Sequence, residues 1–225
     1  MALFDRWRGK TLYFPGCSAK FLQKDIQRRH EQLLTVCGIE YVKLPELEVC
    51  CGMPALEFGF KDDFRNLKSK NNNTFKNQKI SKIICSCQKC YMAFKKYYEE
   101  IEVVHISEVI LENIEKLEKN LEGEEVTFYD ACNPEKYPEL YDNPRKILNE
   151  IRVRVEELEF NKEKSMCCGK SLECVSEGVA QKMADEVLKS VKTEKLVCMS
   201  PDCYLYLKKN NRRGIKVLEL SEVLL

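Results

Sequence analysis

Short runs of apolar, β-favouring residues alternate along the chain with longer segments in which apolar residues recur at helical spacing. The expected strands are residues 11–14, 41–44, 82–85, 102–105, 126–129, 155–160, 195–198 and 215–220. Among the helical segments are 25–38, which ends on a glycine, and 178–191. Strands that alternate with helices are typical of parallel βαβ units, so the pattern predicts an α/β fold.

The same plan of strands, helices and cysteines occurs twice. The matched pairs of segments are 101–111 with 215–225, 83–96 with 196–209, and 12–20 with 127–135. The first pair is identical at six of eleven positions, and the offset between all matched positions stays between 113 and 117. A nearly constant offset indicates a tandem duplication. We therefore expect two repeats, residues 10–120 and 124–225, joined near residues 118–125.

Composition and charge narrow the class of protein. The chain has 225 residues, of which 44% are hydrophobic and 32% charged, and its net charge is +1. Lysines interleaved with glutamates are usual on solvated helix faces, so we expect no nucleic-acid partner. Asp5 and Arg8 interrupt what a signal peptide would need, and no apolar run reaches the roughly 18 residues of a membrane helix. These features favour a cytoplasmic protein without a transmembrane segment.

The 13 cysteines change this picture most. Disulfides do not persist in a reducing cytosol, and an odd number cannot form a complete disulfide framework. Metal binding is therefore expected. Histidine contributes little, because His105 aligns with Glu219 and His30 lies in a charged helical run where we expect it to face solvent.

The cysteines of the first repeat follow the ends of expected strands. Ligands of open parallel sheets lie at the carboxyl ends of strands, so cysteines spread along the sequence can meet at one edge. Adjacent cysteines point to opposite faces of a strand, and the glycine after Cys50 and Cys51 permits the turn that would let both face one ligand. Cys87 and Cys90 have a spacing that suits one metal site. Because zinc and a cubane cluster each take four ligands, five converging thiols suggest a larger or more open iron–sulfur assembly.

The chain from about residue 10 to 225 resembles a known family. Its first half contains YFPGC, CCGMPALEFG, SCQKCY and VVHISEVI, and its second half contains CCG, DNPRKIL and SPDCY. These motifs are similar to the cysteine-rich, or CCG, domain of the disulfide-reducing subunits of heterodisulfide reductases and of the iron–sulfur subunits of glycolate and lactate oxidases. The expected fold is two Rossmann-like βαβ repeats related by a pseudo-two-fold axis, with metal sites at the strand ends. The resemblance implies a noncubane [4Fe–4S] cluster bound by Cys17, Cys50, Cys51, Cys87 and Cys90.

The second repeat departs from the family pattern. Cys132, Cys167, Cys168 and Cys203 stand at matching positions, but Ser200 stands where the first repeat has Cys87. Cys198, which aligns with Cys85, would then complete a second [4Fe–4S] cluster, or four thiolates would hold a cluster or zinc. Cys37 is expected to be a buried structural residue. Cys174, six residues after the second cysteine pair, could approach that site, but the structural interpretation is favoured because free cysteines are so often buried.

The resemblance implies an iron–sulfur redox subunit of heterodisulfide-reductase type. It would pass electrons from a ferredoxin-like iron–sulfur or flavoprotein partner to a disulfide or a related acceptor. The alternative is an electron-transfer iron–sulfur subunit of a flavin-dependent glycolate or lactate oxidase. A zinc-stabilised scaffold is a third possibility, against which the five cysteines of the first repeat argue.

Overall fold

The computed structural model describes residues 9–98, 100–132 and 137–225. Asp5 and Arg8 lie outside the described residues, as do residues 133–135 at the end of the aligned segment 127–135. Across the described ranges, no helix is both long and apolar enough to cross a membrane. The fold is α/β, as the alternating pattern predicts.

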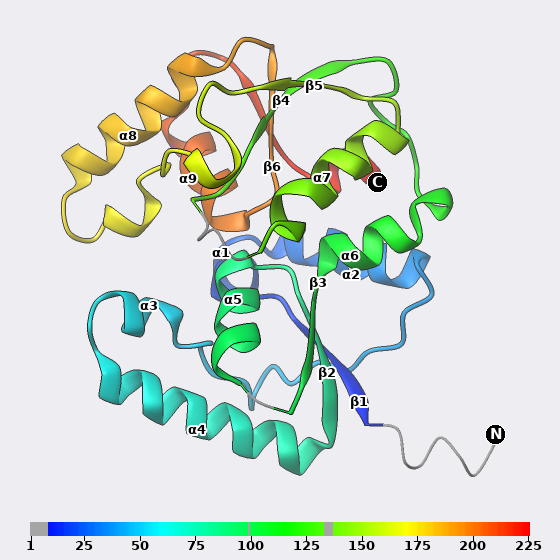
Figure 1. The fold of residues 1–225 in the computed structure, drawn as a ribbon, viewed down its shortest axis with the longest axis vertical. Helices are drawn as coiled ribbons and strands as arrows, with labels where there is room; N and C mark the ends of the chain where they lie inside the picture. Colours follow the sequence, from blue (N-terminus) through cyan, green and yellow to red (C-terminus); the bar gives the residue numbers. More distant parts are fainter. Residues whose placement is uncertain (1–8, 99, 133–136) are drawn as a thin grey trace.

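The strands form two separate sheets, in which every pairing between described strands is parallel. The first sheet has the order β1 (Lys10–Phe14), β2 (Ile80–Cys85), β3 (Glu102–His105). The second has the order β5 (Arg154–Glu157), β4 (Glu125–Tyr129), β6 (Lys195–Cys198), β7 (Lys216–Glu219). The two sheets occupy the lower and upper parts of Figure 1.

The expected strand at 41–44 is reduced to one parallel bridge between Val42 and Leu12. Val42 donates its N–H to the Thr11 carbonyl and accepts from the Tyr13 N–H, at 2.8 and 3.0 Å. Pro45, three residues after Val42, has no N–H to donate, and the chain turns there instead of continuing the hydrogen bonds to β1. This bridge lies beside β1 as β5 lies beside β4, so the two sheets follow one strand order.

Helices cover and separate the sheets. In the first half they are α1 (Cys17–Leu22), α2 (Lys24–Val36), α3 (Met53–Glu57), α4 (Lys61–Gln78), α5 (Gln88–Tyr97), α6 (Ile106–Glu112) and η2 (Ile114–Lys116). In the second half they are α7 (Glu139–Glu150), η3 (Lys162–Lys164), η4 (Lys170–Leu172), α8 (Glu177–Ser190), α9 (Pro201–Asn210) and α10 (Ser221–Leu224). Figure 1 shows α2, α6 and α7 between the two sheets, with α4 and α8 on the outside.

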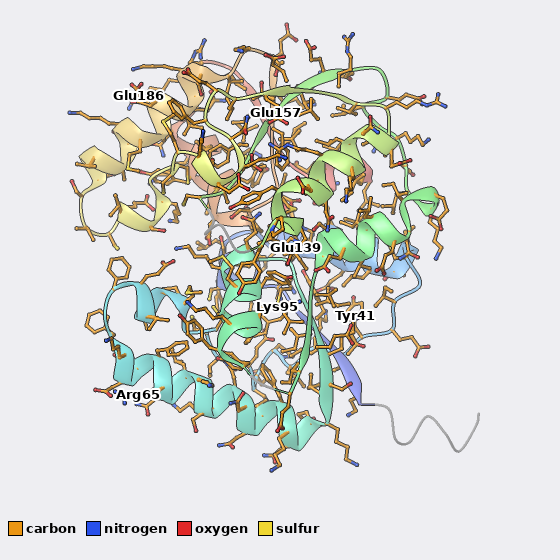
Figure 2. The ribbon with its side chains drawn as sticks, in the orientation of Figure 1. Tyr41, Arg65, Lys95, Glu139, Glu157 and Glu186 are labelled. Carbon is orange, nitrogen blue, oxygen red and sulfur yellow. The ribbon has the colours of Figure 1, made fainter. Side chains whose placement is uncertain are left out.

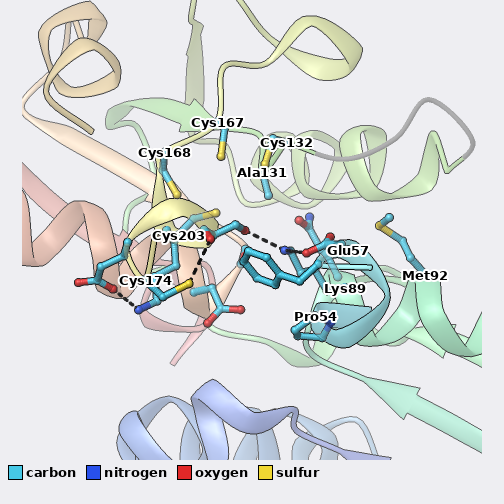
Figure 3. Close-up of a pocket in the computed structure, with 17 residues that line it drawn as sticks. Pro54, Glu57, Lys89, Met92, Ala131, Cys132, Cys167, Cys168, Cys174 and Cys203 are labelled. Atoms are coloured by element: carbon cyan, nitrogen blue, oxygen red, sulfur yellow. Dashed lines mark hydrogen bonds and ion pairs between the residues drawn. The ribbon is translucent and has the colours of Figure 1, made fainter. Parts of the chain in front are cut away.

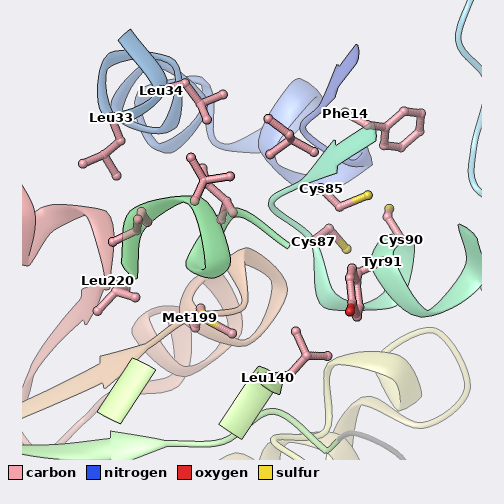
Figure 4. Close-up of a cluster of buried hydrophobic side chains, with 14 of the residues drawn as sticks. Phe14, Leu33, Leu34, Cys85, Cys87, Cys90, Tyr91, Leu140, Met199 and Leu220 are labelled. Atoms are coloured by element: carbon pink, nitrogen blue, oxygen red, sulfur yellow. The ribbon is translucent and has the colours of Figure 1, made fainter. Parts of the chain in front are cut away.

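One apolar core runs through both halves. It contains Phe14, Leu33 and Tyr91 from the first half together with Leu140 and Leu220 from the second, and Figure 4 shows Tyr91 pointing toward Leu140. A smaller cluster lies between the second sheet and helices α8 and α9. Charged side chains such as those of Arg65 and Glu186 point away from the core (Figure 2). The halves therefore share their main core and are not packed independently.

The expectation that His30 faces solvent is wrong. Its side chain is only 2% exposed, and its Nε2 lies 3.2 Å from Oε1 of Glu219. The charged residues around it in the sequence lie on the outer face of α2, whereas His30 lies on the inner face, against α6 and α10. A helix between two sheets buries more of its surface than its sequence suggests, and a polar side chain there needs a partner.

Candidate functional site

The first cysteine set forms where two strands end. Cys17 begins α1, three residues after β1, and Cys87 is the N-cap of α5, two residues after β2. Cys90 lies in the first turn of α5 and is buried. Because β1 and β2 are adjacent and parallel, their carboxyl ends bring these residues together, as the sequence predicts.

The loop with Cys50 and Cys51 completes the set. Gly52 adopts φ +89°, a left-handed conformation that turns the chain immediately after the two cysteines. Asn71 of α4 donates to the Cys50 carbonyl at 3.0 Å, and the Tyr98 hydroxyl donates to the Cys51 carbonyl at 3.2 Å. Sequence reasoning did not identify these two supporting residues, because both are distant in the chain from the loop that they hold.

The five thiols lie close enough to shift one another's pKa. Cys17 Sγ and Cys50 Sγ are 3.8 Å apart, and a neighbouring thiol is the largest cause of the pKa shift of Cys50, Cys51 and Cys90, namely the thiol of Cys17, Cys50 and Cys51 in turn, while Cys87 also raises the pKa of Cys90. Hydrogen bonds from Cys17 and Cys51 lower the pKa of Cys50 well below its ordinary value, while the bond to Cys50 raises the pKa of Cys17. The Gly52 N–H also lies 3.4 Å from Cys50 Sγ. Such a set exchanges its remaining protons for a soft metal group.

The second set has the same order of contacts with one sulfur fewer. Neighbouring thiols are again the largest causes of the pKa shifts: Cys167 raises the pKa of Cys132 and of Cys168, and Cys203 also raises that of Cys168. The Gly169 N–H lies 3.4 Å from Cys167 Sγ, as Gly52 does from Cys50. Bonds from Cys132 and Cys168 lower the pKa of Cys167, and the positive charge of Lys89 contributes.

Each set opens on its own cavity, and the two cavities are neighbours. One, of about 340 Å³, is lined by Cys17, Cys51, Cys87 and Cys90 together with Phe21 and Leu22. The other, of about 390 Å³, is lined by the four second-set cysteines and by Ser200, Cys174, Gln88, Glu57 and Phe58 (Figure 3). Pro54, Lys89 and Asp202 line both cavities and so form the wall between them.

Lys89 is the main charged group of this shared wall. Its Nζ lies 2.5 Å from Glu57 Oε2 and 2.8 Å from Ser171 Oγ, which joins the two halves across the larger cavity (Figure 3). Lys89 and Asp202 occupy equivalent positions in the two repeats, one residue before Cys90 and Cys203. The opposite charges at equivalent positions are a sequence signal that could have identified this pair.

The remaining cysteines lie in different places. Cys37 is buried at the end of α2, as expected. Cys85 and Cys198 end β2 and β6 as fully buried residues of the core, and neither lines a cysteine cavity. The expectation that Cys174 is buried is wrong. After the single turn of η4 the chain runs across the mouth of the larger cavity, which leaves Cys174 exposed there.

Within the described residues, no group of three or more His, Cys, Asp or Glu side chains is arranged as a site for a single metal ion.

The sequence model of the CCG cysteine-rich domain matches residues 11–95 and, a second time, residues 126–208. The chain belongs to the CCG cysteine-rich domain family. Each matched segment extends from the cysteine that follows its first strand to the helix that contains its last site cysteine.

Three curated relatives illustrate the family. The chain is 30% identical over 177 residues to one of the subunits that make up the dihydromethanophenazine:CoB–CoM heterodisulfide reductase of Methanosarcina acetivorans, covering 72% of the chain and 43% of the relative. It is 27% identical over 226 residues to one of the subunits of the CoM/CoB fumarate reductase of Methanothermobacter marburgensis, covering 94% and 45%. It is 32% identical over 146 residues to a probable iron–sulfur-binding oxidoreductase of Bacillus subtilis, covering 61% and 21%. The chain spans less than half the length of these relatives.

Proposed function

We propose that this chain is an iron–sulfur redox subunit of heterodisulfide-reductase type, which passes electrons from a partner to a disulfide or a related acceptor. The names of the relatives, which are oxidoreductases or their subunits, support the redox role. In this proposal the two repeats, 10–120 and 124–225, are Rossmann-like units related by a pseudo-two-fold axis. Their common strand order, with Val42 in the place of β5, supports that relation.

The observation that carries the proposal is the first cysteine set. We assign a noncubane [4Fe–4S] cluster to Cys17, Cys50, Cys51, Cys87 and Cys90. These thiols lie close together, and all of them except Cys50 line one cavity beside the apolar side chains of Phe21, Leu22 and Pro54. Soft thiolate ligands in apolar surroundings suit iron–sulfur chemistry, so the residues fit the group.

When bound, the cluster supplies electrons one at a time and an iron to which a substrate sulfur can bind. The protein residues position it and shape its surroundings. Asn71 and Tyr98 hold the loop of Cys50 and Cys51 from behind, and such supporting contacts orient metal ligands. Lys89 places a positive charge in the wall between the two sites, where it offsets the negative charge of the thiolates.

The larger cavity favours direct contact with a substrate over a purely relaying role. It lies between the halves and is lined by residues at equivalent positions of both repeats, such as Glu57 with Cys174 and Lys89 with Asp202. We assign the second metal site to Cys132, Cys167, Cys168 and Cys203, holding a second cluster or zinc, with Cys198 buried behind it. The electron donor would be a ferredoxin-like or flavoprotein subunit in the cytoplasm.

Metal analysis of anaerobically purified protein tests the proposal. One cluster predicts about four irons per chain with an equal amount of acid-labile sulfide. Cys51→Ala should remove the iron of the first site and lower the melting temperature, because the ligands tie distant segments together. Cys37→Ala is the matched control, since Cys37 is buried but distant from both cavities. Zinc alone without sulfide, or iron lost from the Cys37 variant and kept by the Cys51 variant, would contradict it.

A further inference from the structure

Five cysteines line the larger cavity, although the second repeat has only four at the positions of the first-site ligands. The fifth is Cys174, which comes from the loop after η4 and is exposed at the cavity mouth with its Sγ 3.8 Å from the Ser171 carbonyl (Figure 3). The cavity therefore presents as many thiols as the first site uses. Cys174 is not an isolated cysteine but one member of this group.

The second site lacks a thiol at Ser200, which is 7% exposed and lines the same cavity. A serine hydroxyl is protonated at neutral pH and is a poor ligand for iron in a sulfur-rich site. Cys198 is placed no better than Cys85. Both are the last residue of a strand, both are fully buried, and burial is the largest cause that raises the pKa of each. The first site has five thiols without Cys85, so by equivalence Cys198 belongs to the core.

The segment that carries Cys174 is held over the cavity from several sides. Glu173 is paired with Lys170 and Lys209, at 2.5 and 2.7 Å, and Ser171 accepts from Lys89 at 2.8 Å. In the first repeat, the residue equivalent to Cys174 is Glu57, which also lines this cavity and binds Lys89. At equivalent positions of this cavity, the first repeat thus has the carboxylate of Glu57 and the second has the thiol of Cys174. Only the second repeat supplies a thiol at this position.

Gln88 provides an independent observation beside this cavity. Gln88 lines it and is 5% exposed, and its Oε1 is buried with no hydrogen-bond partner among the described residues. Leaving a buried amide oxygen unsatisfied costs free energy, so such a group usually has a partner. The amide oxygen and nitrogen can exchange places by rotation, and the nitrogen would then donate to a sulfide of a guest.

We propose that Cys174 is the fifth thiolate of a second iron–sulfur site, with Cys132, Cys167, Cys168 and Cys203, and that it replaces the ligand missing at Ser200. This inference rests on the proposed iron–sulfur function. Ligation requires the Cys174 thiol to release its proton to solvent as the sulfur binds iron, and no electron is transferred in that step. The second site is then completed from the cavity mouth, whereas the first is completed by Cys87 from within.

Cysteine alkylation before and after anaerobic reconstitution with ferrous iron and sulfide tests this inference. Cys17, Cys132 and Cys174 are all exposed, so a maleimide should label each of them in the metal-free chain, and peptide mass spectrometry reads them separately. Protection of all three after reconstitution is the expected result. Protection of Cys17 and Cys132 with Cys174 still labelled overturns the inference and leaves the proposed function standing. Labelling of all three after reconstitution refutes both.

Variants distinguish ligation of Cys174 from shielding by a nearby cluster. Cys174→Ala should lose the iron of the second site, about half of the total, while Cys198→Ala keeps it. The double variant Cys174→Ala with Ser200→Cys should recover the iron, because it restores the thiol at the first-repeat position. Since Cys174 is exposed, its replacement leaves the core intact. A Cys174→Ala protein with wild-type iron content and visible spectrum overturns the inference.

Discussion

The two cysteine sites have the same backbone plan but different means of support. Each has a cysteine at a strand end, an adjacent pair before a left-handed glycine, and a last cysteine in the first turn of a helix. In the first site Asn71 and Tyr98 hold the loop of the adjacent pair, whereas in the second the Tyr129 hydroxyl donates to the Met166 carbonyl at 2.7 Å. The two sites thus share a backbone scaffold, and the side chains around it differ.

The polar contacts that join the loops differ in the same way. In the first half Lys20 reaches from the Cys17 helix to Glu48 and to the Pro45 carbonyl, at 3.0 and 2.7 Å. In the second half Arg145 binds both oxygens of Asp130 at 2.8 and 2.7 Å and both of Glu157. Asp130 precedes Cys132 by two residues and accepts from the Lys162 N–H, so it links the two cysteine loops. The comparison indicates a firmer connection in the second half.

The largest difference in the free energy of unfolding should come from replacing the two glycines that follow the cysteine pairs. A Cβ on Gly169 would lie 2.3 Å from the Ala180 carbonyl oxygen, which is backbone of α8 and cannot move away alone. A Cβ on Gly52 would lie 2.7 Å from a ring carbon of Phe64, which can rotate. Both substitutions also incur the cost of a positive φ. We expect Gly169→Ala to lower the free energy of unfolding by about 3–5 kcal/mol and Gly52→Ala by about 2.

Urea unfolding of the metal-free proteins measures both values, so that ligand binding does not contribute. Equal losses for the two variants would show that α8 moves as readily as one aromatic ring, and the comparison of the two loops would then be wrong.

The loss in the free energy of unfolding should differ by a smaller amount between Arg145→Met and Lys20→Met. Both changes keep an unbranched side chain and remove a cation, but Asp130 is fully buried and loses its main partner. We expect about 3 kcal/mol for Arg145→Met, as for other broken buried pairs. Burial already raises the pKa of Glu48, so that carboxyl takes up a proton more easily when Lys20 is lost, and we expect about 1 kcal/mol. Urea unfolding is again the measurement, and a larger loss for Lys20→Met would reverse the assignment of the firmer connection.

The last difference depends on pH and concerns the equivalent residues at the ends of β3 and β7, His105 and Glu219. Burial lowers the pKa of His105 to about 3, whereas Glu219 is paired with His30. Between pH 6.5 and 3 the unfolded chain binds a proton at His105 that the folded chain does not. The free energy of unfolding should therefore fall as the pH falls through this window, by about 1.4 kcal/mol per pH unit from this group.

His105→Asn provides the test, because asparagine can still cap the N–H of Ser107 but does not titrate. The variant should lose less stability than the wild type between pH 6.5 and 4.5. Parallel pH profiles for the two proteins would show that His105 is not the group responsible.

Local patterns predicted much of the architecture and part of the site. The runs at 11–14, 82–85 and 195–198 are strands because their β-favouring side chains are buried in parallel sheets. The run at 41–44 has the same composition and forms only a bridge, since the turn at Pro45 ends the ladder. The convergence of Cys17, Cys87 and Cys90 followed from parallel strands ending at one edge. Local patterns did not predict the burial of His30 or the exposure of Cys174, because each depends on which distant segment packs against the residue.

The sequence by itself determined the α/β class, the two cysteine-rich segments, and which cysteines lie at strand ends, because these depend on short-range periodicity and on spacing along the chain. Only the tertiary structure decided which groups face one another across the two halves. Lys89 and Asp202 lie in one wall, Glu57 shares a cavity with Cys174, and His30 meets Glu219 because two sheets close on the helices between them. Contacts of that kind come from packing two repeats against a shared core, and residues far apart in the sequence carry no local signal of it.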